Sequence, residues 1–292
     1  VLALQRLGVS PAGRPFHGIR YLSAGHQAEA RFRDGHGLGV RRTVLQQDLG
    51  AATDRLGVSR RAGRVDEVRL HDDHVEAAGL RARWLVAADG LHSGVRRGLG
   101  LERRAPGPAR FGQRRHFRVA PATDLVEVHW SPTAEAYVTP VADDVLGVAV
   151  LGPPGRPFED VLEDFPVLRH RIRGAAPVSS VRGAGPLRQV AVARSRGRVL
   201  LVGDAAGYVD ALTGEGISTG LATAEAAVAA LLAGRPEDYE QAWRRATRRY
   251  RVFTNGLLLT ARRPILRRAL VPAASRLPAV FAAAVNAMAC TR

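Results

Sequence analysis

The most constraining feature of the chain is a strand, a turn and a glycine-rich helix start that follow one another between residues 197 and 222. The strand is the apolar run Val199 to Val202, of the kind that a parallel sheet buries on both faces. Asp204 follows at its carboxyl end, where open α/β sheets bind nucleotides and a carboxylate can accept hydrogen bonds from ribose hydroxyls. The sequence therefore predicts a parallel α/β sheet with a nucleotide site after this strand.

The same run continues into a loop and helix start that are rich in glycine. A threonine and two glycines precede a long alanine-rich helix, which we predict over residues 217–232. Backbone N–H groups at such a start are unpaired, and glycine lets a flat or anionic ligand approach the backbone closely. We therefore assign the following residues to a cofactor site: Gly203, Asp204, Thr213, Gly214, Gly216 and Ile217.

The order of these parts resembles the second FAD-contacting motif of the para-hydroxybenzoate hydroxylase and geranylgeranyl reductase group of flavoproteins. In that family the aspartate that matches Asp204 holds the ribose of FAD, and the segment that matches residues 213–216 lies against the isoalloxazine ring. This chain has Ala211 where the family usually has proline, which implies a looser loop beside the flavin. The resemblance implies that the cofactor is FAD.

A second match lies upstream, in residues 83–97. An apolar strand ends in Asp89 and Gly90, and Ser93 follows as a helix cap. The segment resembles the Asp-Gly motif of the same family, in which the aspartate matching Asp89 lies near the FAD pyrophosphate and the arginine matching Arg96 follows on a short helix. The alternative is an ordinary strand and turn followed by solvated arginines. Both motifs in this order are hard to obtain from composition alone, so we assign Asp89 and Gly90 to the cofactor site.

A basic residue leads a further predicted helix. Leu45 and Leu49 stand four residues apart behind Arg42, and this spacing places them on one helical face. The segment resembles the family helix whose leading arginine reaches the flavin nucleotide. The resemblance therefore adds Arg42 to the cofactor site.

The first phosphate-binding motif of the family does not occur in the printed sequence. Members normally begin with a strand, Gly-x-Gly-x-x-Gly and a helix, whereas this chain opens at Val1 with a segment that resembles the helix after that unit. We expect roughly the first forty to fifty residues of a complete member to be missing, taking a βαβ unit of about thirty residues plus a connection. A molecule that begins at Val1 is expected to bind FAD weakly or not at all, because the main site for the pyrophosphate would not exist.

These motifs define the expected fold class. It is α/β, with a truncated FAD-binding Rossmann-like parallel sheet, an inserted antiparallel substrate-binding sheet and C-terminal helices. We expect a discontinuous FAD-binding domain over residues 1–105 and 190–235. A substrate-binding sheet is expected over residues 106–189 and a helical region over residues 236–292. Within the helical region, Pro264, Pro272 and Pro278 are expected to break the last apolar segment into short helices.

The composition excludes several classes of protein. The formal net charge of +16 comes from dispersed arginines, without lysine, and aromatic residues make up 5% of the chain, so we expect no nucleic-acid binding. The single cysteine, Cys290, excludes an intramolecular disulfide framework and suits a reducing cytoplasm, where we place the protein. No secretory signal or bilayer-spanning apolar stretch occurs in these residues.

Two local features carry weaker hypotheses. The basic C-terminal helices suit peripheral contact with an anionic membrane, although a helix pair with a solvated arginine face is the expectation we favour. His71 and His74 lie on a predicted turn without a third ligand that we can identify, so we interpret them as a surface pair and expect no metal site.

The resemblance implies an FAD-dependent oxidoreductase. We expect an NAD(P)H-dependent monooxygenase that hydroxylates a hydrophobic aromatic or polyketide-like small molecule. Because the flavin performs the redox chemistry in this family, we assign no catalytic side chain. Two alternatives stay open. One is a geranylgeranyl reductase-like reduction of isoprenoid double bonds, because residues 212–217 resemble that subgroup more closely. The other is an inactive fragment or a non-catalytic binding protein.

Overall fold

The computed structural model describes residues 1–289, so Cys290 and the inference drawn from it lie outside the described residues. The chain divides into two compact units. The first comprises Val1–Ser59, Arg110–Ala184 and the residues from Leu259 onward, and the second comprises Arg60–Ala109 and Gly185–Leu258.

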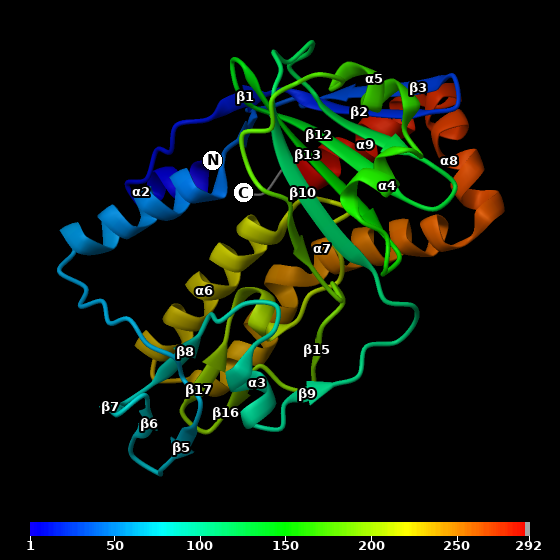
Figure 1. The fold of residues 1–292 in the computed structure, drawn as a ribbon. Helices are drawn as coiled ribbons and strands as arrows, with labels where there is room; N and C mark the ends of the chain where they lie inside the picture. Colours follow the sequence, from blue (N-terminus) through cyan, green and yellow to red (C-terminus); the bar gives the residue numbers. More distant parts are fainter. Residues whose placement is uncertain (290–292) are drawn as a thin grey trace. The chain divides into compact units, whose positions relative to one another are not determined.

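The first unit is built on a largely antiparallel sheet, which has seven strands within residues 1–289 (Figure 1). Their order across the sheet is β14 (Arg182–Ala184), β10 (Phe111–Arg118), β13 (Val145–Gly152), β12 (Glu135–Ala142), β11 (Val126–Trp130), β2 (Gly18–Ser23) and β3 (His26–Arg31). Neighbouring strands are antiparallel except β11 and β2, which pair in parallel. The parallel pair joins the N-terminal hairpin to the middle of the chain.

Alternating side chains give this sheet two covered faces. On one face, Val138 of β12 and Val148 of β13 pack with helices α4 (Phe158–Leu162) and α5 (Pro166–Arg171) in a buried cluster. On the other face, Tyr21 of β2 meets Phe281 of α9, with ring centroids 4.9 Å apart. Pro166 begins α5 as a helix separate from α4.

The C-terminal helices of this unit are α8 (Pro264–Arg276) and α9 (Pro278–Ala289). Prolines begin both helices as expected, but Pro272 lies inside α8 without ending it, which corrects that part of the prediction. Within residues 1–289 no single helix has the length and apolarity to cross a membrane. The two helices pass that test only together, and they are bent by 103° at their junction.

The remaining elements of the first unit precede the sheet or run beside it. They are α1 (Leu2–Arg6), α2 (Arg42–Arg55) and a small antiparallel pair of strands, β1 (Arg14–Phe16) and β4 (Gly37–Gly39). Helix α2 begins at Arg42, as predicted, and buries Leu45.

The second unit contains the nucleotide-binding elements. Strands β8 (Leu85–Ala87) and β17 (Val199–Leu201) pair in parallel, with β16 (Ser195–Arg196) antiparallel on the far side of β17. All three residues of β17 are fully buried, which confirms the predicted doubly covered strand. The other strands are the meander β5 (Val68–Leu70), β6 (Val75–Ala77) and β7 (Leu80–Ala82), and the pair β9 (Glu102–Arg103) and β15 (Val190–Ala191).

Two long helices complete the second unit (Figure 1). Helix α6 (Gly216–Leu232) buries Thr223, Ala227 and Ala230, which share one helical face. Helix α7 (Tyr239–Arg262) turns Tyr239 and Trp243 into the core that surrounds β17. The short elements are α3 (Gly94–Gly98) and two 3₁₀ turns, η1 (Gly203–Ala206) and η2 (Pro236–Asp238).

The structure places the N-terminal residues differently from the expected domain boundaries. Strands β2 and β3 were expected in the FAD-binding domain, but they extend the same sheet as β10 to β14. The helical region also divides, because most of α7 belongs to the second unit and α8 and α9 belong to the first. Backbone pairing between β2 and β11 determines the first assignment, and the α7 core contacts determine the second.

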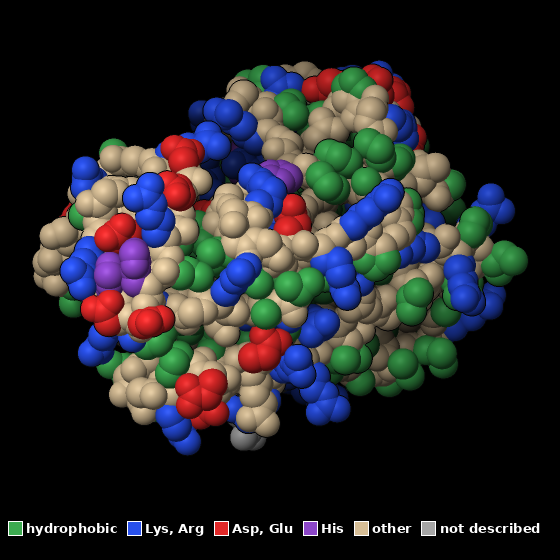
Figure 2. Space-filling view, turned by 90° about the horizontal axis from the view of Figure 1, so that it is seen from below, with side chains coloured by type: hydrophobic (Ala, Val, Ile, Leu, Met, Phe, Trp, Pro, Cys, Tyr) green, Lys and Arg blue, Asp and Glu red, His purple; other side chains and the backbone are tan. Residues whose placement is uncertain are grey.

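The arginines are spread over the surface rather than gathered into one band in the view of Figure 2. On the face drawn there, arginine side chains alternate with acidic and hydrophobic side chains.

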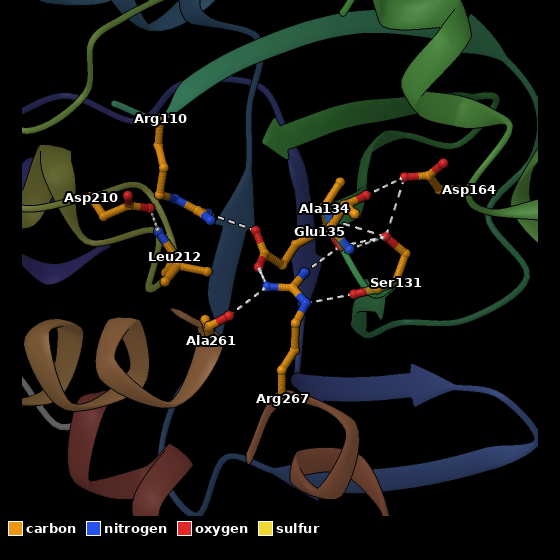
Figure 3. Close-up of polar contacts among 10 residues, drawn as sticks. Arg110, Ser131, Ala134, Glu135, Asp164, Asp210, Leu212, Ala261 and Arg267 are labelled. Carbon is orange, nitrogen blue, oxygen red and sulfur yellow. Dashed lines mark hydrogen bonds and ion pairs between the residues drawn. The ribbon is translucent and has the colours of Figure 1, made fainter. Parts of the chain in front are cut away.

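A buried charge cluster attaches α8 to the large sheet (Figure 3). Arg267 reaches from α8 to the Glu135 carboxylate on β12, which also accepts a hydrogen bond from Arg110 at 2.6 Å. The remaining Arg267 nitrogens donate to the carbonyl oxygens of Ser131 and Ala134, both at 2.6 Å. Glu135 is completely buried and Arg267 is almost so. Because buried charges need partners, the cluster fixes where α8 lies on the sheet.

Candidate functional site

The two predicted acidic turns lie at the same edge of the second unit's parallel strand pair. Asp89 follows β8 and Asp204 follows β17, and the pairing continues past the strands with a Val202 N–H to Ala87 carbonyl bond of 2.9 Å. Since both strands run in the same direction, their carboxyl ends coincide. The structure therefore brings together the two motifs that the sequence placed about a hundred residues apart.

The turn after β17 is held close to helix α6. Gly203 has a φ of +57° and a Cβ placed there would lie 3.6 Å from the Gly220 Cα, so glycine serves both the left-handed backbone and the close approach. The Gly203 N–H also donates to the Thr223 hydroxyl at 3.0 Å. These contacts fix the partly buried Asp204 beside the helix that carries the loop glycines.

The turn after β8 is tied to the short helix α3. Ser93 caps this helix by accepting the Arg96 N–H at 2.9 Å, as predicted, and Asp89 Oδ2 accepts the Val95 N–H at 3.1 Å. Gly90 has a φ of +81° and open space where a Cβ would stand. The turn thus presents an exposed carboxylate and a backbone that a ligand can approach.

The Arg96 side chain connects the turn after β8 to the turn after β17. This side chain is fully buried and donates to the carbonyl oxygens of Leu91 at 2.9 Å and Ala205 at 3.0 Å. It also pairs with Glu102 at 2.9 Å and with the Gln189 amide oxygen at 2.8 Å. The alternative of a solvated arginine is wrong for this residue. One guanidinium thus links the loop that carries Asp89 to the turn that carries Asp204.

The loop that leads to α6 is held by its own side chain and by helix α7. Asp210 Oδ1 accepts the Leu212 N–H at 3.2 Å, a local turn that Figure 3 shows. The Tyr250 hydroxyl accepts the Val209 N–H and donates to the Asp210 carbonyl oxygen at 3.1 Å. These contacts restrain the loop at the position where this chain has alanine in place of proline.

Two further side chains support this loop. The Thr213 and Thr254 hydroxyls lie 3.0 Å apart, which connects the predicted cofactor residue to α7. Burial raises the pKa of the Tyr250 hydroxyl, so this group stays protonated and keeps its donor role. Sequence reasoning missed both α7 residues, because a tyrosine or threonine at helical spacing is typical of an ordinary core.

Replacing Tyr250 with phenylalanine is expected to lower the free energy of unfolding by about 1–3 kcal/mol, because the buried Val209 N–H and Asp210 carbonyl would lose their partner. The looser loop should also weaken FAD binding. Urea unfolding and an FAD titration of the same variant measure both effects. A variant that matches the wild type in both would contradict the role given to this hydroxyl.

The start of α6 fits a flat or anionic ligand. Among residues 1–289, no side chain caps the first turn of this helix, so its leading N–H groups face outward. Gly214 has a φ of +70° with open space around its missing Cβ, and Gly216 has only Tyr208 near it, at 3.8 Å. Burial raises the pKa of the adjacent Glu215, while Arg249 lowers it. Gly214, Gly216 and the start of α6 therefore form an accessible cradle for a flat or anionic ligand.

Arg42, the remaining predicted cofactor residue, lies in the first unit among other arginines. Arg41 is the N-cap of α2 and Arg42 its first residue, while Arg114 and Arg182 face each other as cross-strand partners on β10 and β14. Burial lowers the pKa of Arg114, followed by the charges of Arg42, Arg182 and Arg41. In the described part of the chain these four guanidinium groups form no ion pair. Such a cluster favours an anionic ligand.

His116 borders the same cluster on β10. Its ring Nδ1 lies 3.1 Å from the Ser179 hydroxyl. Burial lowers the pKa of this histidine, and the charges of Arg114 and Arg41 lower it further. The folded protein therefore holds His116 neutral at a pH where an unfolded chain would begin to protonate it.

This shift predicts a pH-dependent stability. Because the folded pKa lies below the unfolded value, the contribution of His116 is complete above about pH 6.5 and is lost as the pH falls toward the folded pKa. Urea unfolding between pH 7.5 and 5.5 should show this decline, and His116→Gln should make the decline shallower. An equally steep decline in the variant would contradict the prediction.

The first unit also contains a pocket of about 880 Å³ beside the β2–β3 hairpin and the end of β11. Apolar side chains line much of it, among them Leu22, Trp130, Phe165 and Val167. Arg268 and His26 add basic groups to the lining. A pocket of this size and lining suits a small hydrophobic molecule.

The chain is similar in sequence to known proteins. A family model described as "FAD binding domain" matches residues 44–237, which include both acidic turns and the loop before α6. Conditioned medium factor receptor 1 of Dictyostelium discoideum is 27% identical over 253 residues, covering 77% of this chain and 48% of that protein. The chain thus spans about half the length of this curated relative.

Solved structures show the same fold. A flavoprotein/dehydrogenase from Cytophaga hutchinsonii superimposes with a TM-score of 0.73 at 16% identity, covering 97% of this chain and 82% of that one. CmlS, a flavin-dependent halogenase, gives 0.71 at 18% identity, with coverages of 83% and 51%. Halogenase PltM in complex with phloroglucinol and FAD gives 0.71 at 16% identity, with coverages of 96% and 67%.

The fold class predicted from the motifs is confirmed by these likenesses. The matched residues include more than half of the chain, and they carry the turns, glycines and buried arginine described above. The chain belongs to the FAD binding domain family, whose model matches the residues of both motifs described above.

Proposed function

We propose that the protein is an NAD(P)H-dependent FAD monooxygenase that hydroxylates a hydrophobic aromatic or polyketide-like small molecule. The observation that carries this proposal is the pair of acidic turns, Asp89 and Asp204, at the end of one parallel strand pair, followed by the open glycine cradle at α6. The family model covers all of these residues. The hydrophobic lining of the 880 Å³ pocket supports the class of substrate.

Each residue of the cradle has a task in binding. Asp204 accepts hydrogen bonds from the FAD ribose, and the turn at Asp89 and Gly90 lies where the pyrophosphate is expected. Gly214 and Gly216 leave room for a flat ring, and the uncapped N–H groups of α6 would donate hydrogen bonds to FAD there. When bound, FAD would carry electrons from the nicotinamide donor to oxygen. The chain itself binds and orients FAD and the substrate, and it excludes water from them.

The arginine cluster supports a phosphorylated electron donor. Arg114 and Arg182 face each other across two strands without an acidic partner among residues 1–289, and a pyrophosphate would neutralise them. We expect Arg114→Ala to raise the KM for NADH or NADPH about tenfold or more and to leave kcat nearly unchanged. Arg173→Ala, an exposed arginine of the same unit, is the control. Equal KM values for the two variants would remove this support for the donor.

Oxygen consumption separates the proposed activity from its alternatives. A hydroxylase takes up oxygen in proportion to substrate and releases a hydroxylated product, whereas a reductase of isoprenoid double bonds turns over without oxygen. The second candidate has a specific basis, since residues 212–217 resemble the geranylgeranyl reductases. Substrate-linked oxygen uptake without added halide supports the proposal. Turnover under anaerobic conditions, turnover that requires halide, or no turnover at all would each contradict it.

The cytoplasmic location and the membrane contact are likewise proposals. The surface of α8 and α9 exposes Ile265 and Val280, which are 83% and 62% accessible, beside Arg268 and Arg276. Apolar side chains next to arginines suit an anionic lipid surface. Sedimentation with vesicles of anionic lipid, compared with neutral vesicles, tests the contact. Equal sedimentation with both would contradict it.

A further inference from the structure

A compact group of metal-ligating side chains lies on the β5–β6 hairpin of the second unit. His71 and His74 flank its two-residue turn, which a His71 N–H to His74 carbonyl bond of 3.0 Å closes. Their rings stack 3° from parallel, with centroids 4.1 Å apart. Glu76 follows His74 by two positions on β6, so the strand presents both side chains on one face. Glu76 thus adds a third side chain of a metal-ligating type beside the two histidines.

The distances within this group suit one small cation. His74 Nε2 lies 3.4 Å from Glu76 Oε1, and His71 Nε2 lies 3.7 Å from Glu76 Oε2. One ligand atom from each of the three residues lies within 4.8 Å of the others. Two atoms that bind zinc at about 2.0–2.1 Å with a tetrahedral angle stand about 3.4 Å apart.

A fourth side chain already orients one of the histidines. His74 Nδ1 lies 2.6 Å from Asp73 Oδ1, and Arg81 holds the other oxygen of this carboxylate at 3.1 Å. A histidine that donates Nδ1–H to a carboxylate keeps Nε2 as the free acceptor. This carboxylate–histidine arrangement is the one that fixes metal-binding imidazoles in proteins. The His74 side chain is only 14% exposed, so its orientation is further restrained by packing.

We propose that His71, His74 and Glu76 bind a zinc ion, with Asp73 orienting His74 and water completing the coordination. Two imidazoles and one carboxylate are a donor set that zinc prefers, whereas calcium and magnesium require more oxygen ligands. His71 and Glu76 are each about two-fifths exposed, so solvent reaches the fourth position. The ion would close the hairpin turn onto β6 and stabilise it. The proposal does not depend on flavin binding or on the proposed reaction.

The alternative is a charge cluster in which the carboxylates share protons with the histidines. The two arrangements differ in their response to metal. We would treat the purified protein with a chelator and titrate Zn²⁺ at pH 7 by calorimetry. We would also titrate Co²⁺, whose visible spectrum reports its coordination. We expect one equivalent to bind, the cobalt spectrum to be tetrahedral or five-coordinate, and the thermal midpoint to rise with zinc.

Variants identify the ligands. His71→Ala, His74→Ala and Glu76→Gln should each weaken zinc binding at least tenfold, and Asp73→Asn should weaken it about 10–100-fold. His36→Ala, an exposed histidine of the other unit, should leave the affinity unchanged. Because these residues lie on a surface hairpin, the folded state of each variant can be checked by circular dichroism. No zinc binding by the wild type would overturn the proposal, as would equal binding by wild type and the His71→Ala/His74→Ala double variant.

Discussion

Replacing Arg96 with methionine is expected to lower the free energy of unfolding by about 3–5 kcal/mol. The Arg96 guanidinium is fully buried, and its removal would leave its hydrogen-bond acceptors without this partner. The acceptors are Glu102, Gln189 and the carbonyls of Leu91 and Ala205. Since the two carbonyls belong to the loops of Asp89 and Asp204, we also expect the variant to lose FAD binding.

The neighbouring residue supplies a matched control. Arg97 lies on the same short helix but is exposed, so Arg97→Met should change the stability by about 0.5 kcal/mol or less. Arg96→Lys keeps the charge but loses the forked geometry, and we expect it to fall between the two. Urea unfolding gives the three stabilities. Arg96→Met and Arg97→Met variants of equal stability would refute the role of Arg96 in joining the turns.

The second large effect is expected at Arg267. Its replacement with methionine would leave Glu135 buried with Arg110 as its remaining charged partner, and the Ser131 and Ala134 carbonyls would each lose the hydrogen bond from Arg267. We expect a loss of about 3 kcal/mol or more in the free energy of unfolding. Helix α8 should become more accessible to protease at the same time, because this cluster attaches it to β12.

Arg268 is the control for this prediction. It follows Arg267 on α8 but is exposed, so Arg268→Met should leave both stability and proteolysis nearly unchanged. Adding Glu135→Leu to Arg267→Met removes the stranded carboxylate and should recover part of the loss. An Arg267→Met protein as stable as Arg268→Met would show that the cluster does not hold the helix.

Much of the second unit, which contains the nucleotide-binding elements, could be predicted from local sequence. The run Val199 to Val202 is too apolar for anything but a buried strand, and the glycines and alanines after it predict the turn and α6. The resemblance to a known family then assigned the two acidic turns to one cofactor site. Local signals sufficed because each motif is contiguous in the chain.

Long-range pairing could not be predicted in the same way. Nothing local to residues 18–31 indicates that β2 pairs in parallel with β11, so the hairpin was assigned to the FAD-binding domain instead of to the large sheet. For residues 106–189, only the presence of an antiparallel sheet could be predicted. A strand's partner depends on surfaces that distant parts of the chain supply.

The supporting residues of the site were missed for a related reason. An arginine such as Arg96 is usually exposed, and its burial depends on acceptors that lie up to 109 positions away. Tyr250 and Thr254 match an ordinary core pattern on α7. Glu76 was missed because His71 and His74 were assigned to a turn, whereas the structure places Glu76 on β6, two positions after His74.

Binding of FAD tests the central claim most directly. Titration of the purified protein with FAD, followed by flavin fluorescence, should show saturable binding that Asp204→Ala weakens by roughly ten- to a hundredfold, since a charged acceptor contributes about 1.5–3 kcal/mol. Asp238→Ala, a surface aspartate of the same unit, should bind as the wild type does. Equal affinity of the wild type and the Asp204→Ala protein for FAD would contradict the assignment of this turn as the flavin site.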